Sequence, residues 1–201
     1  MMKKSKILLI GIFMMLFGVS SFGQGGGMWH FDWNMGFPMG SESTDFISQP
    51  SFRGFSIEGQ GFVTNTITVG GYGAWNVFYE DFGWQTEIHD NVSIYGYKRR
   101  SLNIVPLMVT GHYFFLQGSI QPYAGIGVGT YYIESRDNLG IYYIQGKAWH
   151  FGLAPEVGIV MPVGMGNTGI NVGFKYNMAA KTKDEAGYSW LGINIGLSYL
   201  F

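Results

Sequence analysis

The sequence predicts an all-β fold, an eight-stranded antiparallel up-and-down transmembrane β-barrel, and three observations support this prediction. Charged residues make up 12% of the 201 residues, whereas aromatic residues make up 17%, and there are 32 glycines. No stretch after residue 23 approaches eighteen consecutive apolar residues, so a transmembrane helix is not predicted. Several segments alternate apolar and polar residues with a period of two, as strands with one lipid-facing side do.

The first part of the chain has the features of a cleaved signal peptide. Three lysines among the first six residues precede an apolar run over residues 7–19. Ser21 and Gly23 then provide the small residues of a cleavage site. A run of this length is too short to span a bilayer, although a membrane anchor is the alternative. We therefore expect a signal peptide at residues 1–23 and a barrel at residues 24–201. Without cysteine, the chain cannot form disulfides or thiolate metal sites.

Eight segments carry the strand pattern, each with apolar residues in one phase and small or polar residues in the other. Residues 28–37 illustrate it, because Phe31 and Trp33 alternate with His30 and Asp32. The segments have about the length that a tilted strand needs to cross a bilayer. In chain order the predicted strands are residues 28–37, 53–63, 67–79, 100–115, 122–132, 149–159, 170–178 and 191–201.

The fourth predicted strand, residues 100–115, departs from the regular pattern. Leu102 and Ile104 occupy one phase at its start, whereas Leu107 and Val109 occupy the other phase further along. Proline cannot donate to a strand ladder and is tolerated at bulges. We therefore predict a β-bulge near Pro106.

The connections between these strands alternate in length. Transmembrane barrels have short periplasmic turns and long external loops, and an even number of strands places both termini in the periplasm. The short connections are residues 64–66, 116–119 and 161–168, and the long ones are residues 38–51, 80–99, 134–147 and 179–189. The predicted location is therefore the outer membrane of a Gram-negative bacterium, with both termini periplasmic.

The charged residues are placed as a transmembrane barrel requires. After residue 23, all but five lie in or beside the long connections, and those five, Asp32, Arg53, Glu58, Glu156 and Lys175, are assigned to the polar phase of their strands. A Lys or Arg facing lipid at mid-membrane would cost about 2–4 kcal/mol. An eight-stranded barrel is just wide enough for its side chains, and buried charges must pair. We predict that these five residues form an interior polar network; the alternative is a narrow, carboxylate-lined pathway.

Two long connections contain further strand-like segments. Residues 92–97 follow a predicted turn at Asp90-Asn91, and residues 140–144 follow a predicted turn at residues 136–138. Exposed strand edges can recruit another chain by β-strand addition. The tyrosines of these segments, Tyr95, Tyr97, Tyr142 and Tyr143, are therefore a predicted loop interaction surface. The alternative is that they form only the outer aromatic girdle.

Catalysis, metal binding and nucleic-acid binding are not predicted. Glu87, His89, Asp90 and Ser93 could form a hydrolytic group or a cation site, but they are neighbours on one long loop. A catalytic group needs its members held rigidly within hydrogen-bond reach, and this spacing does not provide that. The formal net charge of −1 does not provide the excess positive charge that nucleic-acid binding requires. We expect no enzymatic activity, no metal and no cofactor.

Two segments carry a resemblance to known proteins: residues Pro122-Tyr123-Ala124-Gly125-Ile126-Gly127-Val128-Gly129 and the terminal Tyr199-Leu200-Phe201. With the alternating hairpins, they resemble the small outer-membrane β-barrel superfamily that includes the OmpA barrel, OmpX and OmpW. The resemblance implies insertion by the outer-membrane assembly machinery, with Phe201 as part of the sorting signal. The glutamine after the cleavage site is similar to that of exported proteins of Bacteroidetes-type bacteria.

The sequence thus predicts a non-enzymatic barrel with a structural, adhesion or complex-docking role through its external loops. The alternative is a narrow channel for small or hydrophobic solutes, which the resemblance to OmpW-like proteins implies. The expected partners are outer-membrane lipid and lipopolysaccharide, the assembly machinery during insertion, and an envelope protein.

Overall fold

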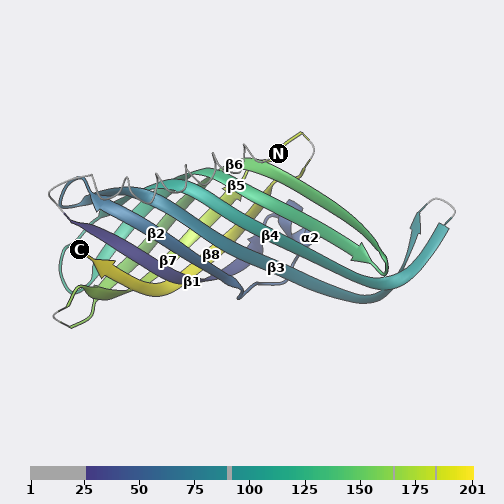
Figure 1. The fold of residues 1–201 in the computed structure, drawn as a ribbon, viewed down its shortest axis with the longest axis horizontal. Helices are drawn as coiled ribbons and strands as arrows, with labels where there is room; N and C mark the ends of the chain where they lie inside the picture. The colour runs from purple at the N-terminus through teal and green to yellow at the C-terminus, as the bar shows by residue number, and fades with distance from the viewer. Residues whose placement is uncertain (1–25, 90–91, 165, 184) are drawn as a thin grey trace, which may run out of the picture.

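The computed structural model describes residues 26–89, 92–164, 166–183 and 185–201, and the predicted signal peptide at residues 1–23 lies outside this part. It is a closed barrel in which each strand pairs with its sequence neighbours and β1 pairs with β8 (Figure 1). Among the described residues, no helix is long and apolar enough to span a membrane. The strands are β1 (Gly27–Met39), β2 (Gly54–Phe62), β3 (Ile67–His89), β4 (Val92–Phe114), β5 (Gln121–Leu139), β6 (Tyr142–Pro162), β7 (Thr168–Ala179) and β8 (Tyr188–Leu200).

All neighbouring strands are antiparallel, so the predicted up-and-down barrel is confirmed. The closing seam is continuous: Phe31 of β1 pairs with Ile57 of β2 on one side and with Leu197 of β8 on the other. The short connections, residues 63–66, 115–120 and 163–167, lie at the end where β1 begins and β8 ends. Closure leaves no sheet edge around the wall, which a barrel in lipid requires.

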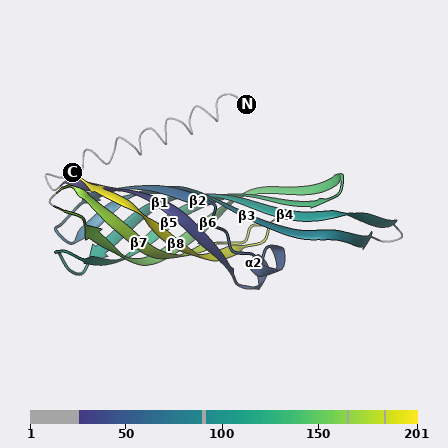
Figure 2. The ribbon, with the colours of Figure 1, turned by 90° about the horizontal axis from the view of Figure 1, so that it is seen from below.

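Four neighbouring strands continue past the opposite end of the barrel and form a protruding sheet (Figures 1 and 2). β3 and β4 pair from Ile67↔Tyr113 as far as His89↔Val92, and β5 and β6 pair as far as Leu139↔Tyr142. The predicted strand at residues 92–97 is therefore present as the start of β4. The predicted turn at residues 136–138 is wrong, because these residues belong to β5 and the chain turns at Gly140, where φ is 60°.

The predicted bulge near Pro106 is also wrong. Pro106 pairs with Tyr131 in an unbroken register between β4 and β5. A register shift occurs instead between Asp81 and Gly83 of β3, where Gly83 has a φ of 76°. Leu102 and Ile104 point into the barrel, as the other even-numbered residues of β4 do. The change of phase in the sequence therefore arises because the interior is apolar at this level, and the strand register does not slip.

The outer wall of the barrel is apolar on every strand. Trp33 is 50% exposed and Phe151 is 60% exposed, although both are large hydrophobic residues. A continuous apolar surface of this kind is unusual in soluble monomers and typical of transmembrane barrels. The exposed outward residues include Phe31, Trp33, Phe55, Ile57, Val69, Trp75, Val109, Ile126, Val128, Phe151, Val157, Ile170, Phe174, Ile195 and Leu197.

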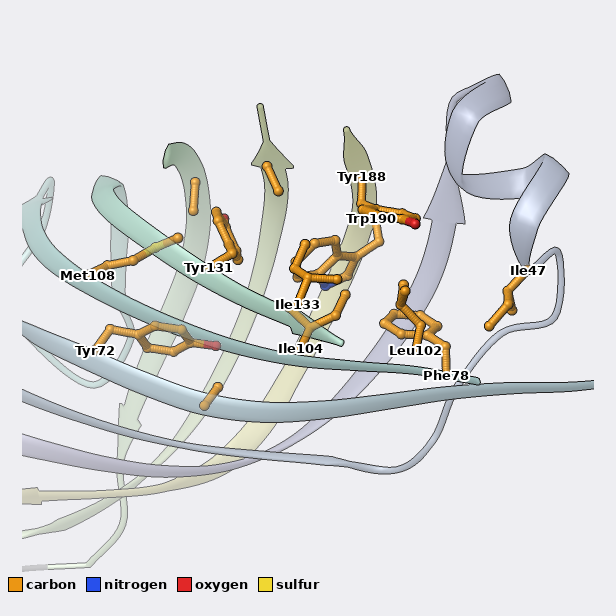
Figure 3. Packing of buried hydrophobic residues seen from close by; sticks show 13 residues of the cluster. Ile47, Tyr72, Phe78, Leu102, Ile104, Met108, Tyr131, Ile133, Tyr188 and Trp190 are labelled. Atoms are coloured by element: carbon orange, nitrogen blue, oxygen red, sulfur yellow. The ribbon is translucent and has the colours of Figure 1, made fainter. Parts of the chain in front are cut away.

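The interior is filled by apolar side chains at both ends, a feature that the alternating pattern of the sequence does not predict. The upper apolar cluster lies toward the protruding sheet and includes Tyr72, Phe78, Leu102, Ile104, Met108, Tyr131, Ile133, Tyr188 and Trp190. Figure 3 shows it extending from Tyr72 and Met108 inside the barrel to Ile47 near α2. The lower apolar cluster, near the short connections, consists of Met28, Phe114, Tyr123 and Val160, with Phe62 and Leu200 packed against it.

The first long connection folds back over the mouth of the barrel and contains a short helix, α2 (Ser41–Phe46), in a segment predicted as a loop. Ile47 follows the helix and is 1% exposed in the upper apolar cluster. The Glu80 carboxylate of β3 accepts hydrogen bonds from the Ser48 amide and hydroxyl at 2.7 and 2.9 Å. The mouth is therefore covered by a segment that the sheet itself holds in place.

Candidate functional site

Between the two apolar clusters lies a band of polar side chains, and its centre is a group of four buried ionisable residues. Glu58 comes from β2, His112 from β4, Glu156 from β6 and Lys175 from β7. Each occupies the inward phase of its strand, because the outward phase is apolar. Four different strands thus place their charged side chains at one level of the lumen.

These four residues form one connected group. The Lys175 ammonium lies 2.6 Å from Glu156 Oε2 and 3.8 Å from Glu58 Oε2. His112 Nε2 is 3.0 Å from Glu156 Oε1, and His112 Nδ1 is 3.8 Å from Glu58 Oε1. Thr110 donates a further hydrogen bond to Glu58 Oε1 at 2.5 Å. Each carboxylate therefore has a cationic or hydrogen-bonding partner, as buried charges require.

A glycine in the wall makes the contact between His112 and Glu156 geometrically feasible. Gly125 of β5 stands between them and pairs with His112 on one side and Glu156 on the other. A Cβ atom at Gly125 would lie 2.1 Å from His112 Cδ2, so any larger residue would displace the imidazole. The absence of a side chain lets the histidine reach across one whole strand to its carboxylate.

Three of these residues have the composition of a metal site. Single donor atoms of Glu58, His112 and Glu156 all lie within 4.8 Å of one another. The Lys175 ammonium already lies beside both carboxylates and is 3.4 Å from the centre of the Tyr72 ring, a cation–π contact. The position that a cation would occupy is therefore next to a fixed positive charge of the chain.

The other predicted members of the interior network are placed differently. Asp32 is buried but interacts with Asn171, whose amide nitrogen lies 3.2 Å from both carboxylate oxygens. Tyr123 donates to the same Asn171 at 3.2 Å. The inclusion of Arg53 was wrong, because it shares the outward phase of Phe55 and is exposed. Its guanidinium lies 5.9 Å from the centre of the Tyr79 ring. It precedes the first residue of β2 and lies past the end of the enclosed lumen.

The predicted interaction tyrosines all lie on the protruding sheet. Tyr95, Tyr142 and Tyr143 are between 60% and 69% exposed. Tyr95 stacks on Trp84 with ring centroids 5.4 Å apart, and Tyr97 meets the same indole edge-on at 5.9 Å. The β3–β4 hairpin and the β5–β6 hairpin therefore present separate aromatic surfaces.

Charges on the outward side of the sheet are paired with one another. Arg99 donates to Asp81 at 3.1 Å, and the Tyr79 hydroxyl donates to the same carboxylate at 2.9 Å. Desolvation acts to raise the pKa of Asp81, but these hydrogen bonds outweigh it and hold that pKa below its ordinary value. In the loop group considered for hydrolysis, Asp90 and the side chain of His89 lie outside the described residues.

Comparison with solved structures finds the same fold in other bacterial β-barrel proteins. Neisserial surface protein A is similar with a TM-score of 0.61 and 15% identity, covering 89% of this chain and 100% of that chain. OprG from Pseudomonas aeruginosa matches at 0.53 and 12%, covering 91% and 99%. Ail, the attachment invasion locus protein of Yersinia pestis, matches at 0.50 and 10%, covering 88% and 97%. No protein-family model and no curated protein matches the chain.

These similarities concern the fold, since every identity is 15% or lower. The three neighbours are outer-membrane or bacterial surface proteins by name, and nearly the whole of each is covered. The function of this chain must therefore be inferred from its own lumen and its own protruding sheet.

Proposed function

We propose that this chain is an outer-membrane protein without enzymatic activity that docks another protein through its protruding sheet. The observation that carries this proposal is the contrast between the two ends of β3–β6. Inside the barrel these strands enclose a packed lumen, and beyond it they expose large apolar side chains to water. The barrel serves as the anchor and the sheet as the binding surface.

The packed interior disfavours the alternative of a solute channel. A solute would have to pass the upper apolar cluster, the charged group and the lower apolar cluster in turn. Trp190 and Tyr131 of the upper cluster pack against each other with ring centroids 5.3 Å apart. Such close packing resists opening, because protein interiors deform little without losing many contacts.

The tip of the β5–β6 hairpin has the composition of a binding surface. Ile141 is 88% exposed, Tyr142 60%, Tyr143 68% and Ile144 78%. Four consecutive large apolar residues exposed to water favour aggregation of a monomer, and such segments commonly mark a site of protein association. Exposed tyrosines add contact area at a small cost in side-chain entropy.

The orientation belongs to the same proposal. The protruding sheet faces outward from the cell, and the end with the short turns and both termini faces the periplasm. The apolar belt contacts membrane lipid and lipopolysaccharide, and Phe201 serves as a signal to the assembly machinery. In support, Phe201 and Gly27 exchange backbone hydrogen bonds of 2.8 and 2.9 Å at the closing seam. Among the similar structures, the name of Ail refers to attachment and invasion.

The test is photocrosslinking in intact cells that express the chain. A photoreactive phenylalanine analogue replaces Tyr143 at the tip, with matched replacements of Phe174 on the lipid face and Thr64 in a short turn. We expect a protein adduct from position 143 and a lipid adduct from position 174. Position 64 should give no adduct with the protein that position 143 captures. Absence of any protein adduct from the tip, with the barrel folded, would contradict the docking function.

A further inference from the structure

The protruding sheet has two lateral edges, β3 and β6, and these edges differ. Between them is a step, because β4 begins at Val92 but pairs with β5 only from Lys98↔Leu139. β2 pairs with β3 as far as Gly54↔Asn76, after which β3 continues to His89. β7 pairs with β6 from Gly152↔Ala179, while β6 begins ten residues earlier, at Tyr142. Each edge is therefore a strand whose outer side has no strand beside it over the protruding part.

The β3 edge carries features that prevent strand addition. Loop residues cover its base, where Ser48 bonds to Glu80 and the Ser51 hydroxyl donates to the Val77 carbonyl. The register shift at Asp81/Gly83 then interrupts the edge, and a charged side chain stands at the shift. Bulges and charges are the usual means by which natural sheets block edge-to-edge pairing.

The β6 edge has none of these features at its tip. Residues 138–146 contain no charged residue and no proline, and the pairing of β5 with β6 runs without a register shift from Gln121↔Val160 to Leu139↔Tyr142. Tyr142, Tyr143 and Ile144 are the exposed residues of this edge. An uncharged, flat edge with aromatic and β-branched residues favours pairing with a strand of the same kind.

We propose that this edge pairs with the same edge of a second copy of the chain, and the proposal rests on the docking function above. The Ala180 amide donates to the Phe151 carbonyl, which fixes the direction of the Phe151 backbone toward β7. Alternate residues of a strand share that direction, so the amide and carbonyl of Tyr143 also point to the open side. Two copies can then exchange both hydrogen bonds at Tyr143.

The side chains agree with this symmetric, antiparallel register. Tyr143 meets Tyr143 of the second copy on the outward face, and Tyr142 meets Ile144 on the other face. Aromatic–aromatic and aromatic–β-branched pairs stabilise antiparallel strands by roughly 0.2–1 kcal/mol each. No like charges oppose one another, because the segment has no charges. One contact is weak, so many copies on each surface would be needed for stable attachment.

The antiparallel direction decides where the second copy lies. In one membrane all copies run the same way, so their β6 strands are parallel. Antiparallel β6 strands require barrels that point at each other, and hence two facing membranes. Tyr143 and Gly152, the β6 residue at which pairing with β7 ends, are nine positions apart in each copy. At about 3.3 Å per residue the two barrel rims would be at most about 60 Å apart. This distance leaves room for the β3–β4 hairpins, which extend from the level of Tyr143 at Arg99 to Val92.

The experiment uses the full chain in two populations of phosphatidylcholine vesicles that carry donor and acceptor dyes. Wild-type vesicles are expected to dock, giving energy transfer, with a uniform membrane gap of about 60 Å by electron cryomicroscopy. Tyr143→Lys in both populations, or Tyr143→Glu in both, should abolish docking through like-charge repulsion. Mixing Tyr143→Lys vesicles with Tyr143→Glu vesicles should restore docking, and added salt should weaken it.

The matched control is Thr86→Lys, at an exposed position on the β3 edge, which should dock like the wild type. Circular dichroism verifies that each variant has folded. Self-pairing is overturned if wild-type vesicles do not dock, if the single charged variants still dock, or if the mixture fails to recover docking. In each of these cases, a photocrosslinked adduct from Tyr143 to a different protein in cells would leave the docking function standing. No adduct would reject both.

Discussion

At the scale of single residues, Lys175 is the residue on which the interior charge group depends. Its ammonium lies beside the carboxylates of both Glu58 and Glu156, and its side chain is 2% exposed. Burying a charged pair costs desolvation energy, and removing one partner leaves the other charge uncompensated. The group therefore constrains which side chains can change alone.

Replacing Lys175 with methionine should destabilise the barrel by about 3–5 kcal/mol, because two buried carboxylates lose their shared cation. Urea unfolding in lipid vesicles measures the change. The double variant Lys175→Met/Glu156→Gln should recover most of the loss. The control is Lys181→Met at an exposed loop position, with an expected change within about 0.5 kcal/mol. Equal stability of Lys175→Met and wild type would contradict the assigned role.

A second residue-scale prediction concerns Gly125. Gly125→Ala should cost about 1–3 kcal/mol of unfolding free energy, because the new methyl group would overlap the His112 ring. Gly71→Ala is the matched control, since its nearest atom would be the Met108 carbonyl oxygen at 3.9 Å. The same urea titration compares both. If the two alanine variants were equally stable, the reach of His112 over Gly125 would not be a packing constraint.

At the scale of elements, two adjacent arginines of β4 connect the sheet to different partners. Arg100 forms an ion pair with Asp137 at 2.8 Å and donates to the Asp45 carbonyl at the end of α2, also at 2.8 Å. Arg99 points to the opposite face and pairs with Asp81. Successive side chains of a strand face opposite sides of the sheet, so neighbouring residues contact different partners. Arg100 thereby holds the covering segment on the mouth of the barrel.

Arg100→Met should loosen this covering segment while leaving the barrel intact. A charge-assisted hydrogen bond contributes about 1.5–3 kcal/mol, so amide hydrogen exchange in residues 41–48 should accelerate at least about tenfold. Arg99→Met serves as the control and should leave these amides unchanged. Unchanged exchange in Arg100→Met would show that Ile47 and Glu80 hold the segment without the arginine.

The lengths of the elements show what the sequence could and could not predict. Lipid imposes an apolar phase, so the period-two pattern identified eight strands and their order. Beyond the lipid no such phase is required, and β3 therefore continues to His89, ten residues past the predicted end. The phase change at Leu102 was ambiguous, because an apolar inward side chain and a register slip produce the same pattern. The contacts inside the barrel decide between them.

The candidate site was predictable in its phase but not in its contacts. The polar phase identified Asp32, Glu58, Glu156 and Lys175 as inward residues. It could not reveal that Asp32 bonds to Asn171 and not to the charged group, because partners lie on strands distant in sequence. His112 was not among the predicted network residues, and its position between the glutamates depends on closure of the barrel.

At the scale of the whole molecule, the chain combines a packed barrel with a projecting sheet. The upper cluster, the charged group and the lower cluster fill the lumen in series, while β3–β6 continue past the barrel. This division explains why charges gather on the protruding part and apolar residues cover the wall. It also connects the interior packing to the proposed function, because a docking anchor needs rigidity and no pore.

The most direct test of this account is the conductance of the purified wild-type chain in a planar lipid bilayer. A lumen filled by two apolar clusters predicts no discrete openings across the voltage range in which the bilayer is stable. The Glu156→Gln variant should likewise show no discrete openings. Steady, discrete openings of the wild-type chain, altered in amplitude by Glu156→Gln, would contradict the sealed lumen and favour the solute channel.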